Sequence, residues 1–193
     1  MRRSPGGELV LAHDPAEART ASALRFSAAL ERLRTGARPG TELLIDLKEP
    51  DTAPAIAAAL KGAGLAARTL VCCGGPDVMH RLAADHPELR RAWSFESVRQ
   101  AAAARLAWPR YSFARQAAAA VALGLAEAVS VRRALVRPRL VRAVHRAGGR
   151  VYAWDVTGAG QARRLSARGV DGLIGDDPRL LREASRSRGR ASA

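Results

Sequence analysis

Residues 138–178 read PRLVRAVHRAGGRVYAWDVTGAGQARRLSARGVDGLIGDDP, and this stretch decides the fold. Pro138 suits the first turn of a helix, which the glycine pair Gly148-Gly149 closes. The segments that follow are an apolar strand, a helical pattern and a second short strand, over 150–156, 161–168 and 170–174. Strands that alternate with helices at this spacing predict a parallel sheet with helices outside it.

The same alternation extends back toward the N-terminus. Five more strands are predicted, over 7–13, 42–48, 69–73, 92–95 and 128–132. Helices are predicted over 16–33, 54–65, 76–85, 97–106, 114–125 and 178–184. The strands are nearly continuous apolar runs, as expected for parallel strands buried on both faces. No change in composition interrupts residues 7–184, so we predict one domain there, with a disordered start over 1–6 and a disordered Arg/Ser tail over 185–193.

Composition limits the function classes. The chain has 193 residues, and 32 Lys and Arg against 18 Asp and Glu give a net charge of +14. A hydrophobic content of 48% excludes a disordered chain. The arginines are spread along the chain and not clustered with aromatics, so we do not favour a nucleic-acid partner. A solvated basic surface explains the charge best, and attraction to an anionic ligand comes second.

Targeting signals are absent from the sequence as read. No apolar run follows the basic residues Arg2-Arg3, and no stretch approaches the roughly 20 apolar residues that span a bilayer. Cys72 and Cys73 are adjacent, so they cannot link distant loops, which fits a reducing compartment. We therefore expect a soluble, cytoplasmic protein without a membrane span; the sequence does not predict an oligomeric state.

Polar residues gather where the predicted strands end, which is where parallel α/β folds build their sites. They are His13-Asp14, Asp46, Lys48-Glu49, Cys72-Cys73 with Gly74-Gly75, Ser94-Phe95-Glu96, Arg132-Arg133, Trp154-Asp155 and Asp176-Asp177. Carboxylates, cations and an imidazole on one rim suit a divalent metal and an anionic substrate.

Each candidate also has a purely structural interpretation. Asp14 and Pro15 can cap and begin a helix, and Trp154 on a strand is more often a core residue than a ligand wall. Asp46 and Lys48 are two positions apart, so both side chains project from one strand face. Opposite charges on a buried face need a partner or a ligand, which makes this pair the most informative feature.

Four segments together resemble the glycerophosphodiester phosphodiesterase family. They are ELVLAHDP at 8–15, LLIDLK at 43–48, LVRAVHRAGGRVYAWD at 140–155 and GVDGLIGDDP at 169–178. The resemblance is strongest over 138–181 and covers nearly all of 7–184. It implies a (β/α)8 barrel of the TIM type that hydrolyses a glycerophosphodiester, a small anionic substrate, to glycerol 3-phosphate and an alcohol.

The resemblance also implies roles for individual residues. His13 would be one of two histidines that act as general acid and base, and Asp46 a ligand of a divalent metal, Mg or Ca. Lys48 would neutralise the phosphate and Trp154 would form a wall against the glycerol. This chemistry is physically sensible, because a histidine can protonate the leaving alkoxide.

The sequence departs from the family pattern at its beginning. The family's first two strands carry His-Arg-Gly and Glu-x-Asp, which are absent here, so the barrel is expected to be incomplete and to lack one catalytic histidine and two metal carboxylates. Asp46 stands where the family has Glu, one methylene longer. Seven predicted strands plus the family's two give nine, so either 8–13 or 92–95 is expected not to be a barrel strand.

Three functions remain open from the sequence. The first is an enzyme whose chain lacks its true N-terminus and is impaired as it stands. The second is a non-catalytic relative that binds a phosphoester or a protein partner. The third is a basic nucleic-acid binder that shares only the fold.

Overall fold

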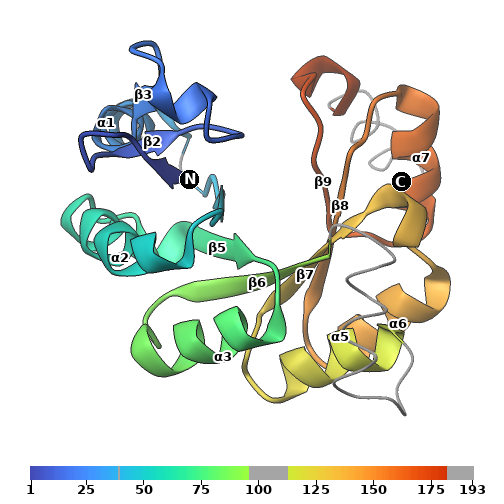
Figure 1. Ribbon diagram of the computed structural model, residues 1–193. Coiled ribbons are helices and arrows are strands. Elements are labelled where there is room, and N and C mark those ends of the chain that lie inside the picture. Colours follow the sequence, from blue (N-terminus) through green and yellow to red (C-terminus); the bar gives the residue numbers. More distant parts are fainter. Residues whose placement is uncertain (39, 96–112, 182–193) are drawn as a thin grey trace. The chain divides into compact units, whose positions relative to one another are not determined.

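The computed structural model describes residues 1–38, 40–95 and 113–181, and the chain divides into two compact units (Figure 1). Unit 1 comprises residues 1–73 and 77–91. Unit 2 comprises residues 74–76 and the described residues from 92 onward. The single domain expected over 7–184 stays a prediction.

Unit 1 begins with a small antiparallel sheet of three strands, β1 (Arg2–Arg3), β2 (Leu9–Leu11) and β3 (Leu24–Arg25). Val10 lies opposite Arg2 on one side and Arg25 on the other, and it is buried. The expected disorder of residues 1–6 is therefore wrong, because β1 is hydrogen-bonded to β2. The strand predicted over 7–13 forms, but it belongs to this antiparallel sheet.

The helix predicted over 16–33 is wrong in its first half. The 3₁₀ turn η1 (Glu17–Arg19) and β3 precede the helix α1 (Phe26–Gly36). The Asp14 carboxylate accepts a hydrogen bond from the backbone N–H of Glu17 at 2.9 Å, and the Thr20 hydroxyl donates to the carbonyl of Glu17 at 2.7 Å. Such local bonds between side chain and backbone compete with helix formation.

The parallel β/α succession then starts with β4 (Leu43–Asp46), α2 (Ala53–Gly62), β5 (Thr69–Cys73) and α3 (Pro76–Asp85). β4 and β5 pair in parallel from Leu43 opposite Thr69 to Asp46 opposite Cys72. Every residue of β5 is buried, but burial alternates along β4 and leaves Leu44 and Asp46 exposed. Leu43 and Ile45 are only partly buried, so the burial predicted for this strand is wrong along β4, which stands at the end of its sheet.

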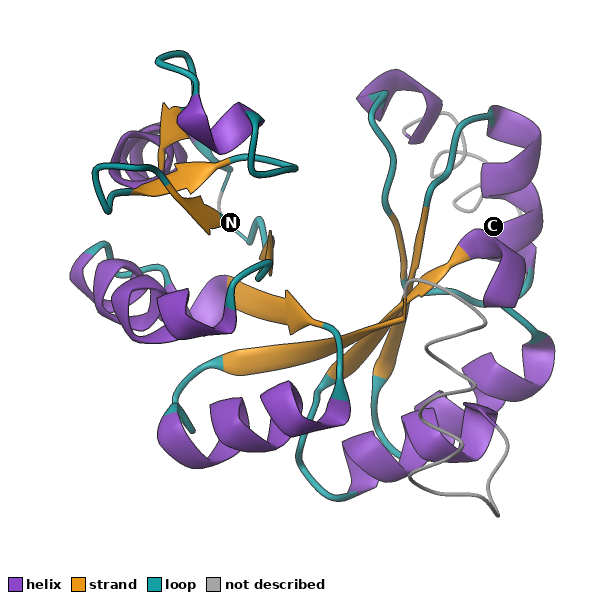
Figure 2. Ribbon diagram, in the orientation of Figure 1, coloured by secondary structure: helices purple, strands orange, loops and turns teal. Residues whose placement is uncertain are grey.

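Unit 2 continues the succession with four parallel strands in chain order. Its elements are β6 (Arg90–Phe95) apart from its first two residues, which belong to unit 1, then α5 (Phe113–Ala122), β7 (Ala128–Arg132), η4 (Arg133–Leu135), α6 (Pro138–Arg146), β8 (Arg150–Trp154), α7 (Ala159–Ala167) and β9 (Gly172–Leu173). β7 lies between β6 and β8, and four of its five residues are buried. Helices α5, α6 and α7 lie outside the strands (Figure 2). The helix predicted over 97–106 and the tail 185–193 lie outside the described residues, as does part of the helix predicted over 178–184.

Helix α5 and the start of β8 approach each other closely at Gly149. A Cβ atom at this position would lie 2.7 Å from Val121 Cγ2 and 3.1 Å from Val144 Cγ1. The neighbouring Gly148 has a φ of +85°, in the left-handed region that favours glycine after a helix. The glycine pair therefore both ends α6 and leaves room for the next strand.

The strand count agrees with an incomplete (β/α)8 barrel. Among the described residues, six strands, β4 to β9, belong to the β/α succession. Of the two candidates for the surplus strand, 8–13 is the one outside this succession, and 92–95 is part of β6. No helix of the described residues is both long enough and apolar enough to cross a bilayer.

Candidate functional site

The carboxyl end of β4 carries the ion pair that the sequence singled out. Lys48 Nζ lies 2.8 Å from Asp46 Oδ2, so the two side chains share a face as their spacing predicts. The side chain of Asp46 is 51% exposed and that of Lys48 is 22% exposed. The pair is thus accessible from solvent and not enclosed in the core.

Further charged groups surround this end of β4. The α-ammonium group of Met1 donates a hydrogen bond to the backbone carbonyl of Asp46 at 2.6 Å, and burial lowers the pKa of this amino group. The carboxylate of Glu49 binds the Arg2 guanidinium at 3.2 Å and accepts a hydrogen bond from the backbone N–H of Arg3 at 3.0 Å. The carboxylates of Asp46 and Glu49 therefore both have partners already: Lys48 for Asp46, and Arg2 and the N–H of Arg3 for Glu49.

His13 lies beyond the end of β2 and is exposed. Its backbone N–H donates to the carboxylate of Glu17 at 2.6 Å, and its carbonyl accepts from Arg2 at 3.3 Å. Within the part of the chain that the structure describes, its imidazole makes no hydrogen bond or ion pair. The N–H of Glu17 lowers the pKa of the Asp14 carboxyl group. The N-cap of this 3₁₀ turn is Ala16, so the interpretation of Asp14 and Pro15 as the cap and first residue of a helix is wrong.

The described residues do not fit a divalent metal. Mg²⁺ and Ca²⁺ take six or more oxygen ligands, with several from carboxylates or waters. Over 1–38, 40–95 and 113–181, no three His, Cys, Asp or Glu side chains lie close enough together to hold an ion. Asp46, the ligand implied by the family resemblance, instead binds Lys48.

The thiol of Cys73 at the end of β5 is not a reactive nucleophile. Burial raises the pKa of Cys73 to about 12, and its Sγ lies 3.1 Å from Met79 Sδ. A thiol is nucleophilic as the thiolate, which is scarce at neutral pH with such a pKa. Neither cysteine forms a disulfide.

In unit 2, the carboxyl ends of β7 and β8 meet in a cluster around Asp155. The carboxylate of Asp155 lies 3.2 Å from Arg132 Nε and 2.6 Å from Arg133 Nη1, and its carbonyl accepts from Arg133 at 3.1 Å. Its backbone has a φ of +66°, which few residues other than Gly, Asn and Asp adopt. These residues were all strand-end candidates, but their mutual contact was not predicted.

Trp154 pairs with Arg132 across the parallel strands β8 and β7. The guanidinium carbon of Arg132 lies 5.9 Å from the centre of the indole ring, within the range of a cation–π contact. The indole Nε1 is buried and has no hydrogen-bond partner among the described residues. A buried donor without a partner costs free energy.

The sequence of the chain places it in a known family. The model of the glycerophosphoryl diester phosphodiesterase family matches residues 42–180, most of the chain, so the protein belongs to this family. No curated protein matches the sequence. The family resemblance is therefore confirmed, with the segments 43–48 and 140–178 inside the match and the segment 8–15 outside it.

Several solved structures share the fold of this chain. A glycerophosphodiester phosphodiesterase from Agrobacterium tumefaciens is 21% identical with a TM-score of 0.69, over 96% of this chain and 84% of its own. A Silicibacter pomeroyi protein named for the same activity is 19% identical with a TM-score of 0.73, over 86% and 57%. A phosphodiesterase from Oleispira antarctica, solved with the product sn-glycerol-3-phosphate, is 18% identical with a TM-score of 0.61, over 85% and 62%.

These neighbours establish the fold, an incomplete (β/α)8 barrel. Their identities are too low to carry more than the fold to this chain. The chain spans 57% of the length of the Silicibacter protein and 62% of that of the Oleispira enzyme. The activity of a whole family member is therefore a matter for proposal.

Proposed function

We propose that this chain is a glycerophosphodiester phosphodiesterase-like protein that binds glycerophosphodiesters or glycerol 3-phosphate and hydrolyses the diester only slowly as it stands. The observation that carries the proposal is the family match over 42–180, which includes the Asp46–Lys48 pair at the carboxyl end of β4. A cytoplasmic location remains a prediction.

Lys48 is proposed to bind the phosphate. Its ammonium group has three N–H donors, so it can keep its bond to Asp46 and still donate to a phosphate oxygen. The side chain is mostly buried, which limits the rotamer freedom lost on binding. The role that the family resemblance implies for Trp154 in unit 2, a wall against the glycerol, stays a prediction.

His13 is proposed as the group that gives a proton to the leaving alcohol. Its imidazole is exposed, and an imidazole can act as a general acid toward a leaving alkoxide. A divalent metal, Mg or Ca, is the family's expected cofactor, but the described residues do not assemble its ligands, and no step is assigned to it. The lack of an assembled set of metal ligands among the described residues is the physical reason for proposing slow hydrolysis.

A second candidate is phosphoester binding without turnover. It is favoured by the bond between Asp46 and Lys48, which occupies the carboxylate that the family resemblance assigns to the metal. The two candidates share a ligand and differ in one measurable quantity, the release of product.

One experiment addresses both. The purified 193-residue chain is incubated with glycerophosphocholine and Mg²⁺ or Ca²⁺, and release of glycerol 3-phosphate is measured beside the Agrobacterium enzyme. Binding of glycerol 3-phosphate is measured by calorimetry. We expect binding, with hydrolysis at least about 100-fold slower than that of the Agrobacterium enzyme, a loss of roughly 3 kcal/mol in transition-state stabilisation.

Lys48→Met provides the decisive variant, and Lys61→Met its matched control. These are the only two lysines of the chain, and Lys61 is exposed in the last turn of α2. Lys48→Met should weaken binding of glycerol 3-phosphate at least 10-fold and Lys61→Met should leave it unchanged. Hydrolysis as fast as that of the Agrobacterium enzyme contradicts the slow turnover, and failure of the wild type to bind contradicts the whole proposal.

A further inference from the structure

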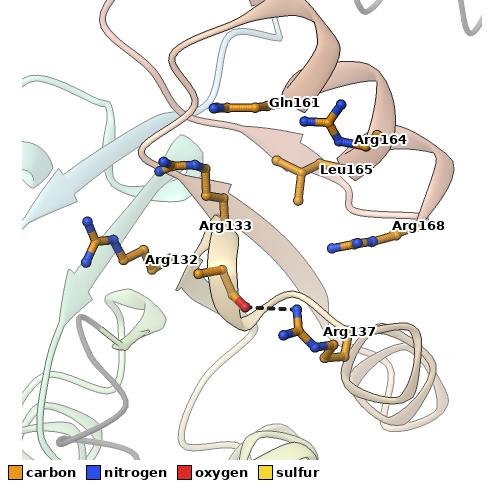
Figure 3. Close-up of a pocket in the computed structure, with 8 residues that line it drawn as sticks. Arg132, Arg133, Arg137, Gln161, Arg164, Leu165 and Arg168 are labelled. Carbon is orange, nitrogen blue, oxygen red and sulfur yellow. Dashed lines mark hydrogen bonds between the residues drawn. The ribbon is translucent and has the colours of Figure 1, made fainter.

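A pocket of about 450 Å³ opens in unit 2 between the segment that joins β7 to α6 and one face of α7 (Figure 3). Its lining consists of Arg132, Arg133, Ala134, Arg137, Gln161, Arg164, Leu165 and Arg168. Three of these residues belong to α7 and Arg168 is its C-cap; Arg164 and Leu165 follow Gln161 by three and four positions, and Arg168 follows Arg164 by four, so they share one helix face. Neither Trp154 nor any residue of unit 1 lines this pocket.

Three of the arginines are each anchored to the protein through one of their own guanidinium nitrogens. Arg137 Nη1 donates to the carbonyl of Ala134 at 2.9 Å, as Figure 3 shows, and Arg168 Nη1 donates to the carbonyl of Val136 at 3.0 Å. Arg133 Nη1 binds the carboxylate of Asp155. Each guanidinium has five N–H groups, so further donors remain for a ligand. Anchoring before binding reduces the entropy that a ligand must offset.

Two other lining residues supply donors that the fold does not use. Within the described part of the chain, the side chain of Arg164 makes no hydrogen bond or ion pair, and it is exposed. The oxygen Oε1 of Gln161 accepts from the backbone N–H and the hydroxyl of Thr157, at 3.1 and 3.3 Å. The amide nitrogen of Gln161, a donor, is then the group left for a ligand.

The charge of the pocket is strongly unbalanced. Among the described residues, five guanidinium groups and no carboxylate line it; Asp155 behind Arg132 and Arg133 compensates one charge and leaves a surplus of four. Like charges held this close repel one another, and the repulsion is relieved by a bound anion. One phosphate monoester carries only about −1.5 to −2, so two or more linked phosphates are needed to match the surplus.

We propose that this arginine pocket is a second anion site, which binds a compact ligand with at least two linked phosphate groups. Arginine suits such a ligand because its planar fork can bind phosphate oxygens in pairs. Its lining includes neither Asp46 nor Lys48, the residues of the proposed glycerophosphodiester site, whose ligand bears a single charged phosphate.

The test is calorimetric titration of the full chain with inorganic pyrophosphate and tripolyphosphate at about 0.15 M salt, where surface charges are screened over roughly 8 Å. The variant Arg164→Gln/Arg168→Gln should bind both at least 10-fold more weakly. Arg163→Gln is the matched control, because Arg163 is the adjacent exposed arginine of α7 and does not line the pocket. Arg164→Lys, which keeps the charge but not the fork, serves as a second variant and should lose part of the affinity.

Several outcomes would overturn the proposal. One is failure of the wild type to bind either polyphosphate; another is an equal loss in Arg163→Gln, which would indicate a diffuse basic surface. A short single-stranded RNA that binds the wild type as tightly per phosphate, regardless of Arg164 and Arg168, would indicate a nucleic-acid surface instead. Binding of glycerol 3-phosphate should not change in the double variant, so a failure here and a failure of the proposed function can be told apart.

Discussion

β4 in unit 1 and β8 in unit 2 both end beside an aspartate that binds cations, but the two ends differ in charge balance. Asp46 faces one lysine and its side chain is 51% exposed. Asp155 faces two arginines, is 31% exposed and has a left-handed backbone. In unit 1 the Asp46 carboxylate pairs with one cation, Lys48. In unit 2 the Asp155 carboxylate binds two guanidinium groups and leaves a net positive charge around it. The aspartate–cation contact at the end of β4 is therefore proposed to take part in substrate binding, and the one at the end of β8 is proposed to support the structure.

The largest effect is expected at Asp155. Asp155→Ala removes the acceptor of two charged hydrogen bonds and puts a residue with a Cβ and no local hydrogen bonding at a positive φ. We expect the free energy of unfolding to fall by about 2–4 kcal/mol, measured by urea denaturation followed by circular dichroism.

Asp155→Gly separates the two causes, because glycine loses the carboxylate but adopts the positive φ readily. It should be less destabilising than Asp155→Ala by about 1 kcal/mol. Equal stabilities of both variants and the wild type would mean that the Asp155 cluster does not support unit 2.

An intermediate effect is expected from Cys73 in unit 1. Its pKa is raised from 9.0 to about 12, so its contribution is complete below the unfolded-state value near 9 and is lost as pH rises toward 12. At pH 10 the loss should be about 1 kcal/mol, since the unfolded thiol ionises and the folded thiol does not. The stability difference between wild type and Cys73→Ala should therefore shrink between pH 9 and 12, and a constant difference would contradict the shift.

The smallest effect on stability is expected at Asp46. Asp46→Asn removes the partner of Lys48, but exposed ion pairs contribute only about 0–1 kcal/mol. Binding of glycerol 3-phosphate should nevertheless become tighter, because the variant removes a negative charge beside the proposed phosphate site at Lys48. A large loss of stability with unchanged binding would show that Asp46 resembles Asp155 and would remove the contrast between the two strand ends.

The most regular part of the fold could be predicted from sequence. The β-branched strand over 128–132, the proline that begins α6 and the glycine pair that ends it each carry a local signal, and the elements form where these signals stand. The start of the chain could not be predicted in the same way. The alanine-rich residues 16–25 favour a helix by propensity. Instead, the side chains of Asp14 and Thr20 form hydrogen bonds to nearby backbone, and β3 pairs with β2.

The candidate site was predictable only where its residues are neighbours in sequence. The spacing of two between Asp46 and Lys48 fixes a common strand face, so their contact follows directly. The contact of Asp155 with Arg132 and Arg133 depends on the register of β7 against β8, which the spacing does not contain. The arginine pocket was missed because its residues span 132–168, although the repeat at 161, 164, 165 and 168 on one helix face is a signal that could have identified half of it.

The glycine at position 149 has a consequence for the strand that follows it. It is a spacer of minimal thickness, since even a methyl group would collide with Val121 and Val144. Because β8 begins at the next residue, any displacement here would propagate along the strand to the indole and carboxylate at its far end. The positions of Trp154 and Asp155 at one end of β8 therefore depend in part on the absence of a Cβ atom at Gly149, at the other end.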